Sequence, residues 1–110
     1  MAKTIIGTFI MKDEGDGCLT SKHLEETDDT PFVECCKLIT ASVGHASPFV
    51  GDYTTCWIEP GGNVQNGSLK ISLIGHVYQL DWSIIIHSTT TYSGKAMMSE
   101  GKLVGVYWDK

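Results

Sequence analysis

The chain has 110 residues, 42% hydrophobic and 19% charged, which suits one globular domain with its own core. All eight basic residues are lysine and the formal net charge is −5. Nucleic-acid binding depends on basic patches and favours arginine, so we do not expect a nucleic-acid partner. No apolar run reaches the roughly 18–20 residues of a membrane-spanning helix, so we expect no membrane partner either.

The first expected element is a strand over residues 3–12, because this segment has a short apolar run without the cleavage pattern of a signal peptide. We therefore expect a cytoplasmic protein with a single domain, residues 1–110. The "DEGDG" segment that follows is typical of a tight hairpin turn and lacks the spacing of a calcium loop. Eight of the thirteen acidic residues lie between Asp13 and Glu34, and we interpret them as a solvated face.

The rest of the chain also reads as strands, since no window shows a sustained helical period. Further strands are expected at about 17–24, 31–41, 49–58, 67–74, 77–86, 91–98 and 102–108. Segments rich in glycine, proline, asparagine and serine separate them. The "NGS" segment at Asn66 matches the glycosylation acceptor pattern, but Asn-Gly is also a strong hairpin signal and we expect a turn there.

Alternating apolar and polar side chains indicate antiparallel sheet with one buried and one wet face. Eight strands hide their edges completely when they close on themselves. We therefore predict an all-β fold, an eight-stranded antiparallel up-and-down β-barrel, with a two-sheet β-sandwich as the alternative. Glycines inside the strands are expected where a strand coils or where bulky side chains cross the interior; they are Gly7, Gly51, Gly94 and Gly105.

The last strand, "KLVGVYW", is apolar on both faces, with Val104 and Trp108 on one side and Leu103 and Tyr107 on the other. An apolar outer face indicates that something covers it. A second copy of the chain is the simplest cover, so we expect a homodimer through this strand.

The cysteines form no C-x-x-C pair, so we expect buried free thiols, with a disulfide or a zinc site as lesser alternatives. Adjacent Cys35 and Cys36 should face opposite sides of their strand. The histidines show no carboxylate or cysteine partner at ligand spacing, and we expect solvated turn residues, with haem ligation by one of them as a minor alternative. The four are His23, His45, His76 and His87.

Aromatic and hydroxyl side chains recur on the expected inward faces. An eight-stranded barrel is just wide enough to fill itself with side chains or to hold one small ligand. Rings would form the walls of a pocket and hydroxyl groups would orient the ligand. The candidate ligand-binding residues are Tyr53, Thr55, Trp57, Tyr78, Trp82, Tyr92 and Trp108.

We expect the partner to be a small apolar or amphipathic molecule, without a cofactor. The alternative is a barrel filled by its own side chains that acts as a protein–protein interaction module. A cavity of at least a few hundred Å³ between the aromatic residues would support the ligand-binding interpretation, and a barrel filled by side chains would count against it. An enzyme is the third choice, because no nucleophile with a base and no glycine loop for phosphate is apparent. Asp81 and Glu59 are expected to face outward.

The segments "FVGDYTT", "YQLDWS", "TTTYSG" and "LVGVYW" occur in an order that resembles the calycin pattern of small ligand-binding barrels. "HSTTTYSG", with the strand before it, is similar to the corresponding strands of the avidin–streptavidin family. The resemblance implies hydrogen bonds to the ligand from Tyr53, Thr55, Ser88 and Thr90, and ring contacts from Trp82, Tyr92 and Trp108. Tyr92 stands where that family has tryptophan, so we take the resemblance as support for the barrel and not for biotin.

Overall fold

The structure is a computed structural model that describes residues 5–26, 29–41, 47–58, 61–84 and 90–109. These residues form eight strands: β1 (Ile6–Gly15), β2 (Cys18–Glu25), β3 (Phe32–Ala41), β4 (Gly51–Ile58), β5 (Val64–Ile74), β6 (Val77–Ile84), β7 (Thr90–Ser99) and β8 (Lys102–Asp109). Among the described residues, no helix has the length and apolar character needed to cross a membrane.

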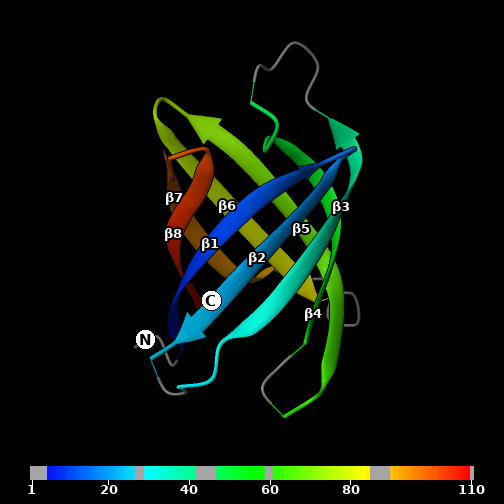
Figure 1. The fold of residues 1–110 in the computed structure, drawn as a ribbon, viewed down its shortest axis with the longest axis vertical. Helices are drawn as coiled ribbons and strands as arrows, with labels where there is room; N and C mark the ends of the chain where they lie inside the picture. The colour runs from blue at the N-terminus through cyan, green and yellow to red at the C-terminus, as the bar shows by residue number, and fades with distance from the viewer. Residues whose placement is uncertain (1–4, 27–28, 42–46, 59–60, 85–89, 110) are drawn as a thin grey trace.

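Each strand pairs antiparallel with the next in the chain, and β8 pairs antiparallel with β1. The sheet therefore closes into a barrel with no free edge (Figure 1). This confirms the predicted eight-stranded antiparallel up-and-down β-barrel and excludes the two-sheet sandwich. Closure satisfies the backbone hydrogen-bonding groups of every strand on both sides, which explains why so many short strands are stable together.

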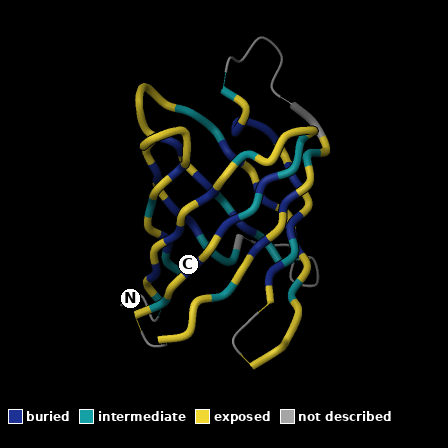
Figure 2. Tube along the Cα trace, in the orientation of Figure 1, coloured by how far each residue is buried: buried dark blue, intermediate teal, exposed yellow. Residues whose placement is uncertain are grey.

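Buried and exposed residues alternate along the strands, as the blue and yellow segments of Figure 2 show, so successive side chains face inward and outward. Residues paired across strands share a face, so Met11 of β1 lies beside both Ser21 of β2 and Leu103 of β8. The middle of the barrel is filled by fully buried apolar side chains, among them Met11, Leu19, Leu69, Leu80 and Leu103. Each such side chain contributes about 1.5–3 kcal/mol by leaving water.

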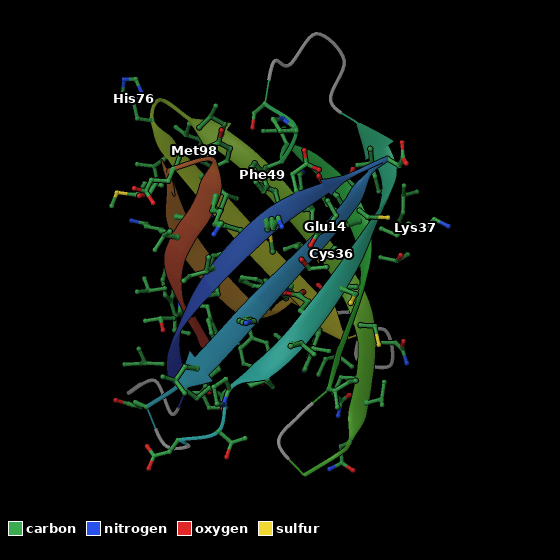
Figure 3. All side chains as sticks on the ribbon, in the orientation of Figure 1. Glu14, Cys36, Lys37, Phe49, His76 and Met98 are labelled. Carbon is green, nitrogen blue, oxygen red and sulfur yellow. The ribbon has the colours of Figure 1, made fainter. Side chains whose placement is uncertain are left out.

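One end of the barrel, where β1, β3, β5 and β7 finish, is closed by the segment that leads into β4. Phe49 is buried there, near the upper end of the barrel in Figure 3. The Tyr53 hydroxyl donates to the Phe49 carbonyl at 2.9 Å, and the Tyr78 hydroxyl donates to Ser47 Oγ at 2.8 Å. We call this the closed end. With reference to the described residues alone, we call the opposite end, where β2, β4, β6 and β8 finish, the open end.

Glycines inside strands make room for rings that cross the interior. A Cβ atom on Gly7 would lie 2.4 Å from Cζ of Tyr107, and one on Gly94 would lie 3.0 Å from Cζ3 of Trp82. The first distance is too short for a real contact and the second is tight, and at Gly94 the Cβ atom would also lie 2.7 Å from the backbone oxygen of Val106, so glycine is needed at both positions. The expectation that bulky side chains cross at strand glycines is confirmed at these two positions.

The predicted turn at Asn66 is wrong. Asn66 and Gly67 lie within β5, which begins at Val64, and Asn66 pairs with Cys56 of β4. A Cβ atom on Gly67 would lie 2.2 Å from the backbone oxygen of Ser83. The glycine is therefore needed for close approach of two strands rather than for a turn.

The "DEGDG" hairpin is confirmed, since Asp16 and Gly17 adopt left-handed φ angles of 54° and 76° between β1 and β2. All four cysteines are free thiols, also as expected, and Cys35 and Cys36 face opposite sides. Only Cys36 is buried, however. The prediction of buried thiols is wrong for Cys18, Cys35 and Cys56, because alternation places them on the outer face.

Candidate functional site

A carboxylate lies inside the barrel. Glu34 is only 1% exposed, because Val33 and Cys35 on either side of it in β3 face outward and leave its own side chain on the inner face. The interpretation of the acidic residues from Asp13 to Glu34 as a solvated face is therefore wrong for Glu34. A buried charge of this kind requires partners, because desolvating an isolated carboxylate is very costly.

Four side chains donate hydrogen bonds to Glu34. Its Oε1 atom accepts from Ser21 Oγ at 2.9 Å and from His23 Nε2 at 2.8 Å. Its Oε2 atom accepts from Thr55 Oγ1 and from Trp82 Nε1, the latter at 2.8 Å. An ionised carboxylate can accept about four hydrogen bonds, so donors from β2, β4 and β6 satisfy it fully.

The hydrogen bonds also determine the charge of Glu34. Burial by itself raises the pKa of this carboxyl group, but the hydrogen bond and charge of His23 and the hydrogen bonds from Thr55 and Trp82 outweigh burial. The pKa of Glu34 therefore lies below its ordinary value of 4.5. The side chain is a carboxylate at neutral pH, held by the interior of the barrel.

His23 is the partner of Glu34 and is not a solvated turn residue, which corrects the prediction. It lies in β2, is 5% exposed, and its ring stacks between Phe9 and Phe32 with centroid distances of 5.7 and 5.0 Å. Its Nε2 atom must carry a hydrogen, because a carboxylate can only accept. The Nδ1 atom is buried and has no hydrogen-bond partner among the described residues.

A cavity of about 40 Å³ adjoins this network at the open end of the barrel. One water molecule needs a cavity volume of roughly 10–15 Å³, so this cavity has room for a small polar group. Its lining residues are His23, Glu25, Phe32, Glu34, Trp57, Trp82, Tyr92 and Tyr107. In the described part of the barrel, the interior beyond this cavity is filled by side chains and holds no space of a few hundred Å³.

The walls of the cavity are rings that brace one another. Trp57 and Tyr92 meet edge to face at 6.3 Å, as do Tyr92 and Tyr107 at 6.0 Å. The Tyr107 hydroxyl donates to Glu25 Oε2 at 3.0 Å. Burial, followed by the charge of Glu25, raises the pKa of Tyr107, so its hydroxyl remains protonated and acts as the donor. The ring arrangement is thus held by packing and by a carboxylate at the mouth.

Three of the predicted ligand-binding residues meet at this cavity, namely Trp57, Trp82 and Tyr92. Thr55 does not line it but supports it from below, through its hydrogen bond to Glu34. The sequence interpretation missed the polar partners His23 and Glu34. Alternation along β2 and β3 could have placed both residues on the inner face of the barrel. This signal was obscured because the outward residues Leu24 and Val33 are apolar.

The remaining three predicted residues lie elsewhere. Tyr53 and Tyr78 are at the closed end, where their hydroxyls bond to the segment before β4, and burial raises the pKa of Tyr53 to about 12. Trp108 lies on the outer face, because its neighbour Tyr107 faces inward and Trp108 pairs with outward-facing Ser93. None of the three contributes to the cavity.

Other sequence predictions can be placed as well. Asp81 faces outward as expected and accepts a hydrogen bond from Ser93 at 2.9 Å. His76 is an exposed residue beside the β5–β6 turn, again as expected (Figure 3). Predictions that lie outside the described residues or side chains concern Glu59, His45, His87, Ser88 and Thr90.

The geometry argues against nucleophilic catalysis at this network. Ser21 Oγ lies 2.9 Å from His23 Nε2, but both groups give their hydrogens to the same oxygen of Glu34. Nε2 therefore has no lone pair with which to take a proton from Ser21. Cys36 donates to Thr55 at 3.4 Å, and burial raises its pKa, so it stays a thiol. The arrangement is suited to recognising a polar group.

No group of three or more histidine, cysteine, aspartate or glutamate side chains in the described ranges is placed to hold a metal ion. Comparisons of the chain with protein-family models, with curated proteins and with solved structures found no match. The likeness to calycin and avidin–streptavidin barrels therefore depends on the residues quoted above. What the structure establishes is an eight-stranded antiparallel up-and-down β-barrel with a polar, aromatic-walled cavity at one end.

Proposed function

We propose that this protein is a calycin-like barrel that binds a small amphipathic molecule at its open end. The observation that carries the proposal is that His23, whose buried Nδ1 atom has no hydrogen-bond partner among the described residues, lines an aromatic-walled cavity. Leaving a buried polar atom without a partner costs about 1–3 kcal/mol. A ligand with a hydrogen-bond donor would remove that cost by bonding to Nδ1.

The size of the cavity limits the mode of binding. A space of about 40 Å³ accepts a polar head group but not a whole drug-sized ligand. The head would enter between His23 and Trp82, and the apolar remainder would lie at the mouth against Phe32 and Tyr92, which are only half-buried. The condition set for a ligand enclosed by the barrel, a cavity of a few hundred Å³, is not met among the described residues. The proposal is therefore limited to a head group held at the open end.

Indole N–H signals in NMR spectra provide the test, because the three tryptophans report on different places. Trp57 and Trp82 line the cavity, whereas Trp108 lies on the outer face. Titration with small amphipathic compounds of positive, neutral and negative charge should shift the Trp57 and Trp82 signals saturably and leave Trp108 unchanged. A panel that produces no saturable shift, or one confined to Trp108, rejects the proposal.

A pair of variants separates cavity binding from weak association with the surface. Phe32→Ala removes a ring that lines the cavity, and should weaken binding about tenfold through lost apolar contact. Ile39→Ala removes an exposed apolar side chain from the same strand and should leave the dissociation constant unchanged. Equal effects of the two substitutions would contradict a site at the open end.

As a second candidate function, we propose an interaction module that self-associates through the outer face of β1, β7 and β8. Val104 of β8 pairs with both Ile10 of β1 and Met97 of β7, and all three side chains are exposed, so they form one apolar row. Light scattering should give a dimer for the native chain and a monomer for Val104→Lys. A native chain that stays monomeric at all concentrations rejects this function.

A further inference from the structure

The charged groups around the cavity favour a positively charged ligand over a negatively charged one. Two carboxylates, Glu25 and Glu34, lie among the lining residues, and no lysine does. The chain contains no arginine at all. An anionic head group would therefore meet two carboxylates at short range, and His23 is the only lining residue that can carry a positive charge to offset them.

The polar groups around the buried carboxylate have already given their hydrogens away. The hydrogens of Ser21, Thr55 and Trp82 are all given to Glu34. The His23 Nε2 hydrogen is given to the same carboxylate, whereas Nδ1 has no hydrogen-bond partner among the described residues and can accept from a ligand in the ring tautomer that carries its hydrogen on Nε2. At the mouth, the Glu25 carboxylate accepts one hydrogen bond from Tyr107 and has the capacity to accept more.

Aromatic faces supply the remaining surface. Phe32, Trp57, Trp82, Tyr92 and Tyr107 line the cavity together with the acceptors. The face of an aromatic ring is electrostatically negative, so it attracts cations, and the attraction is greatest where water is excluded. Rings, carboxylates and a lone-pair nitrogen around one small space all favour a positively charged hydrogen-bond donor.

We propose that the ligand is an amine whose protonated head enters the cavity, with an apolar or aromatic body at the open end. An ammonium group is close to a water molecule in size, so it fits the space of about 40 Å³. One N–H donates to Nδ1 of His23, the charge faces Glu25, and the rings enclose the methylene groups next to the nitrogen. This assignment of the ligand class rests on the proposed function, since it names what the same site binds.

Three compounds with nearly the same body and different heads test the ligand class by calorimetry. They are 2-phenylethylamine, 2-phenylethanol and 3-phenylpropionate, which are positive, neutral and negative at neutral pH. The amine should bind about tenfold more tightly than the alcohol, and the carboxylate should bind most weakly. An alcohol that binds as well as the amine overturns the ligand class but leaves the binding function standing. If none of the three compounds binds and the NMR titrations show no saturable shift, both the ligand class and the binding function are overturned.

A variant that changes only the charge of Glu25 shows whether this carboxylate at the mouth is responsible for the preference for the amine. Glu25→Gln keeps an acceptor for Tyr107 and should weaken amine binding about fivefold while the alcohol changes by less than about twofold. Glu14→Gln removes the same charge from an exposed position at the other end of the barrel and should change neither compound. Thermal melting of both variants checks that the fold is intact. Equal losses in the two variants would mean that net charge, and not this site, attracts the amine, which overturns the proposal.

The opposite charge state of the histidine predicts the opposite order of the three compounds. If His23 carried two hydrogens, Nδ1–H would donate to an anionic head group. Binding of 3-phenylpropionate that exceeds that of the amine at neutral pH would therefore overturn the assignment.

Discussion

At the scale of single residues, Glu34 organises the inner end of the cavity. One fully buried carboxylate orients the hydroxyls of Ser21 and Thr55, the indole of Trp82 and the imidazole of His23. Such networks are stable only when every member is satisfied, because an unpaired buried polar group is costly in a low-dielectric interior. Among the described side chains, the one buried polar atom without a hydrogen-bond partner is His23 Nδ1. A hydrogen bond from a bound molecule would satisfy it.

Glu34→Gln should lower the free energy of unfolding by about 3 kcal/mol, measured by urea denaturation at pH 7. The amide keeps the size of the side chain but replaces one acceptor oxygen by a donor NH₂ group. That group would face existing donors, whichever way the amide is turned. Glu14→Gln is the matched control, since Glu14 is exposed at a hairpin and its contacts with Thr20 and Lys12 lie in solvent, and it should shift the denaturation midpoint far less than Glu34→Gln does. A midpoint for Glu34→Gln equal to that of the native chain would contradict the network.

The lowered pKa of Glu34 predicts how this contribution depends on pH. In the unfolded chain the carboxyl titrates at its ordinary value of 4.5, and in the folded chain it titrates below that value. The unfolded state therefore binds more protons over this interval, so stability falls as the pH decreases. The stability difference between the native chain and Glu34→Gln should be constant above pH 4.5 and shrink below it. Urea denaturation at several pH values measures it, and a difference that grows in acid would be inconsistent with the charge assignment.

At the scale of secondary-structure elements, glycines decide how closely neighbouring strands and crossing rings can pack. Gly105 of β8 pairs with Phe9 of β1 and with Ala96 of β7. A Cβ atom on Gly105 would lie 2.2 Å from the backbone oxygen of Lys95 and 2.8 Å from the Cβ atom of Ala96. The backbone cannot move away from such a contact without disturbing the ladder that closes the barrel.

Gly105→Ala should therefore destabilise the protein by about 1–3 kcal/mol, as expected for overpacking a well-filled interior. Gly61→Ala is the matched control, because a Cβ atom there has no neighbour within 4 Å and the residue is exposed. Thermal denaturation of both variants checks the prediction. A melting temperature for Gly105→Ala that equals that of Gly61→Ala would show that β7 and β8 tolerate separation.

At the scale of the whole molecule, closure makes all eight strands depend on one another. Removing any strand would expose two edges, and β1 and β8, which are farthest apart in the chain, form one of the eight pairings. We predict that the chain unfolds as one cooperative domain. At about 0.7 kcal/mol per residue near 60 °C, 110 residues correspond to an unfolding enthalpy of about 75 kcal/mol. Scanning calorimetry should give equal calorimetric and van't Hoff enthalpies. A calorimetric enthalpy well above the van't Hoff enthalpy would indicate units that unfold separately.

Much of this architecture was predictable from local patterns. Alternation with a period of two located the strands, and the short turns between them predicted antiparallel hairpins. Trp57, Trp82 and Tyr92 were assigned to the inner face for the same reason. The error at Asn66 arose because Asn-Gly has two uses, and only the neighbouring strand, through Ser83, shows that the glycine serves close packing.

The site was harder to predict because it combines residues that are distant in the chain. Ser21, Glu34, Thr55 and Trp82 lie on four strands, and nothing in the local sequence indicates that their side chains converge. Trp108 and Tyr107 show most clearly what the alternation of side chains cannot predict. Both faces of the last strand are apolar, so alternation alone could not decide which of the two aromatic residues lies inside.

The sequence by itself determined that the chain forms short antiparallel strands with an aromatic inner face, because strand alternation and turn chemistry are local properties. Only the tertiary structure decided which end of the barrel is closed, that Glu34 and His23 pair inside it, and that Tyr107 rather than Trp108 faces the cavity. These features depend on the registers of strands around a closed ring, where a shift of one residue would turn every side chain to the opposite face.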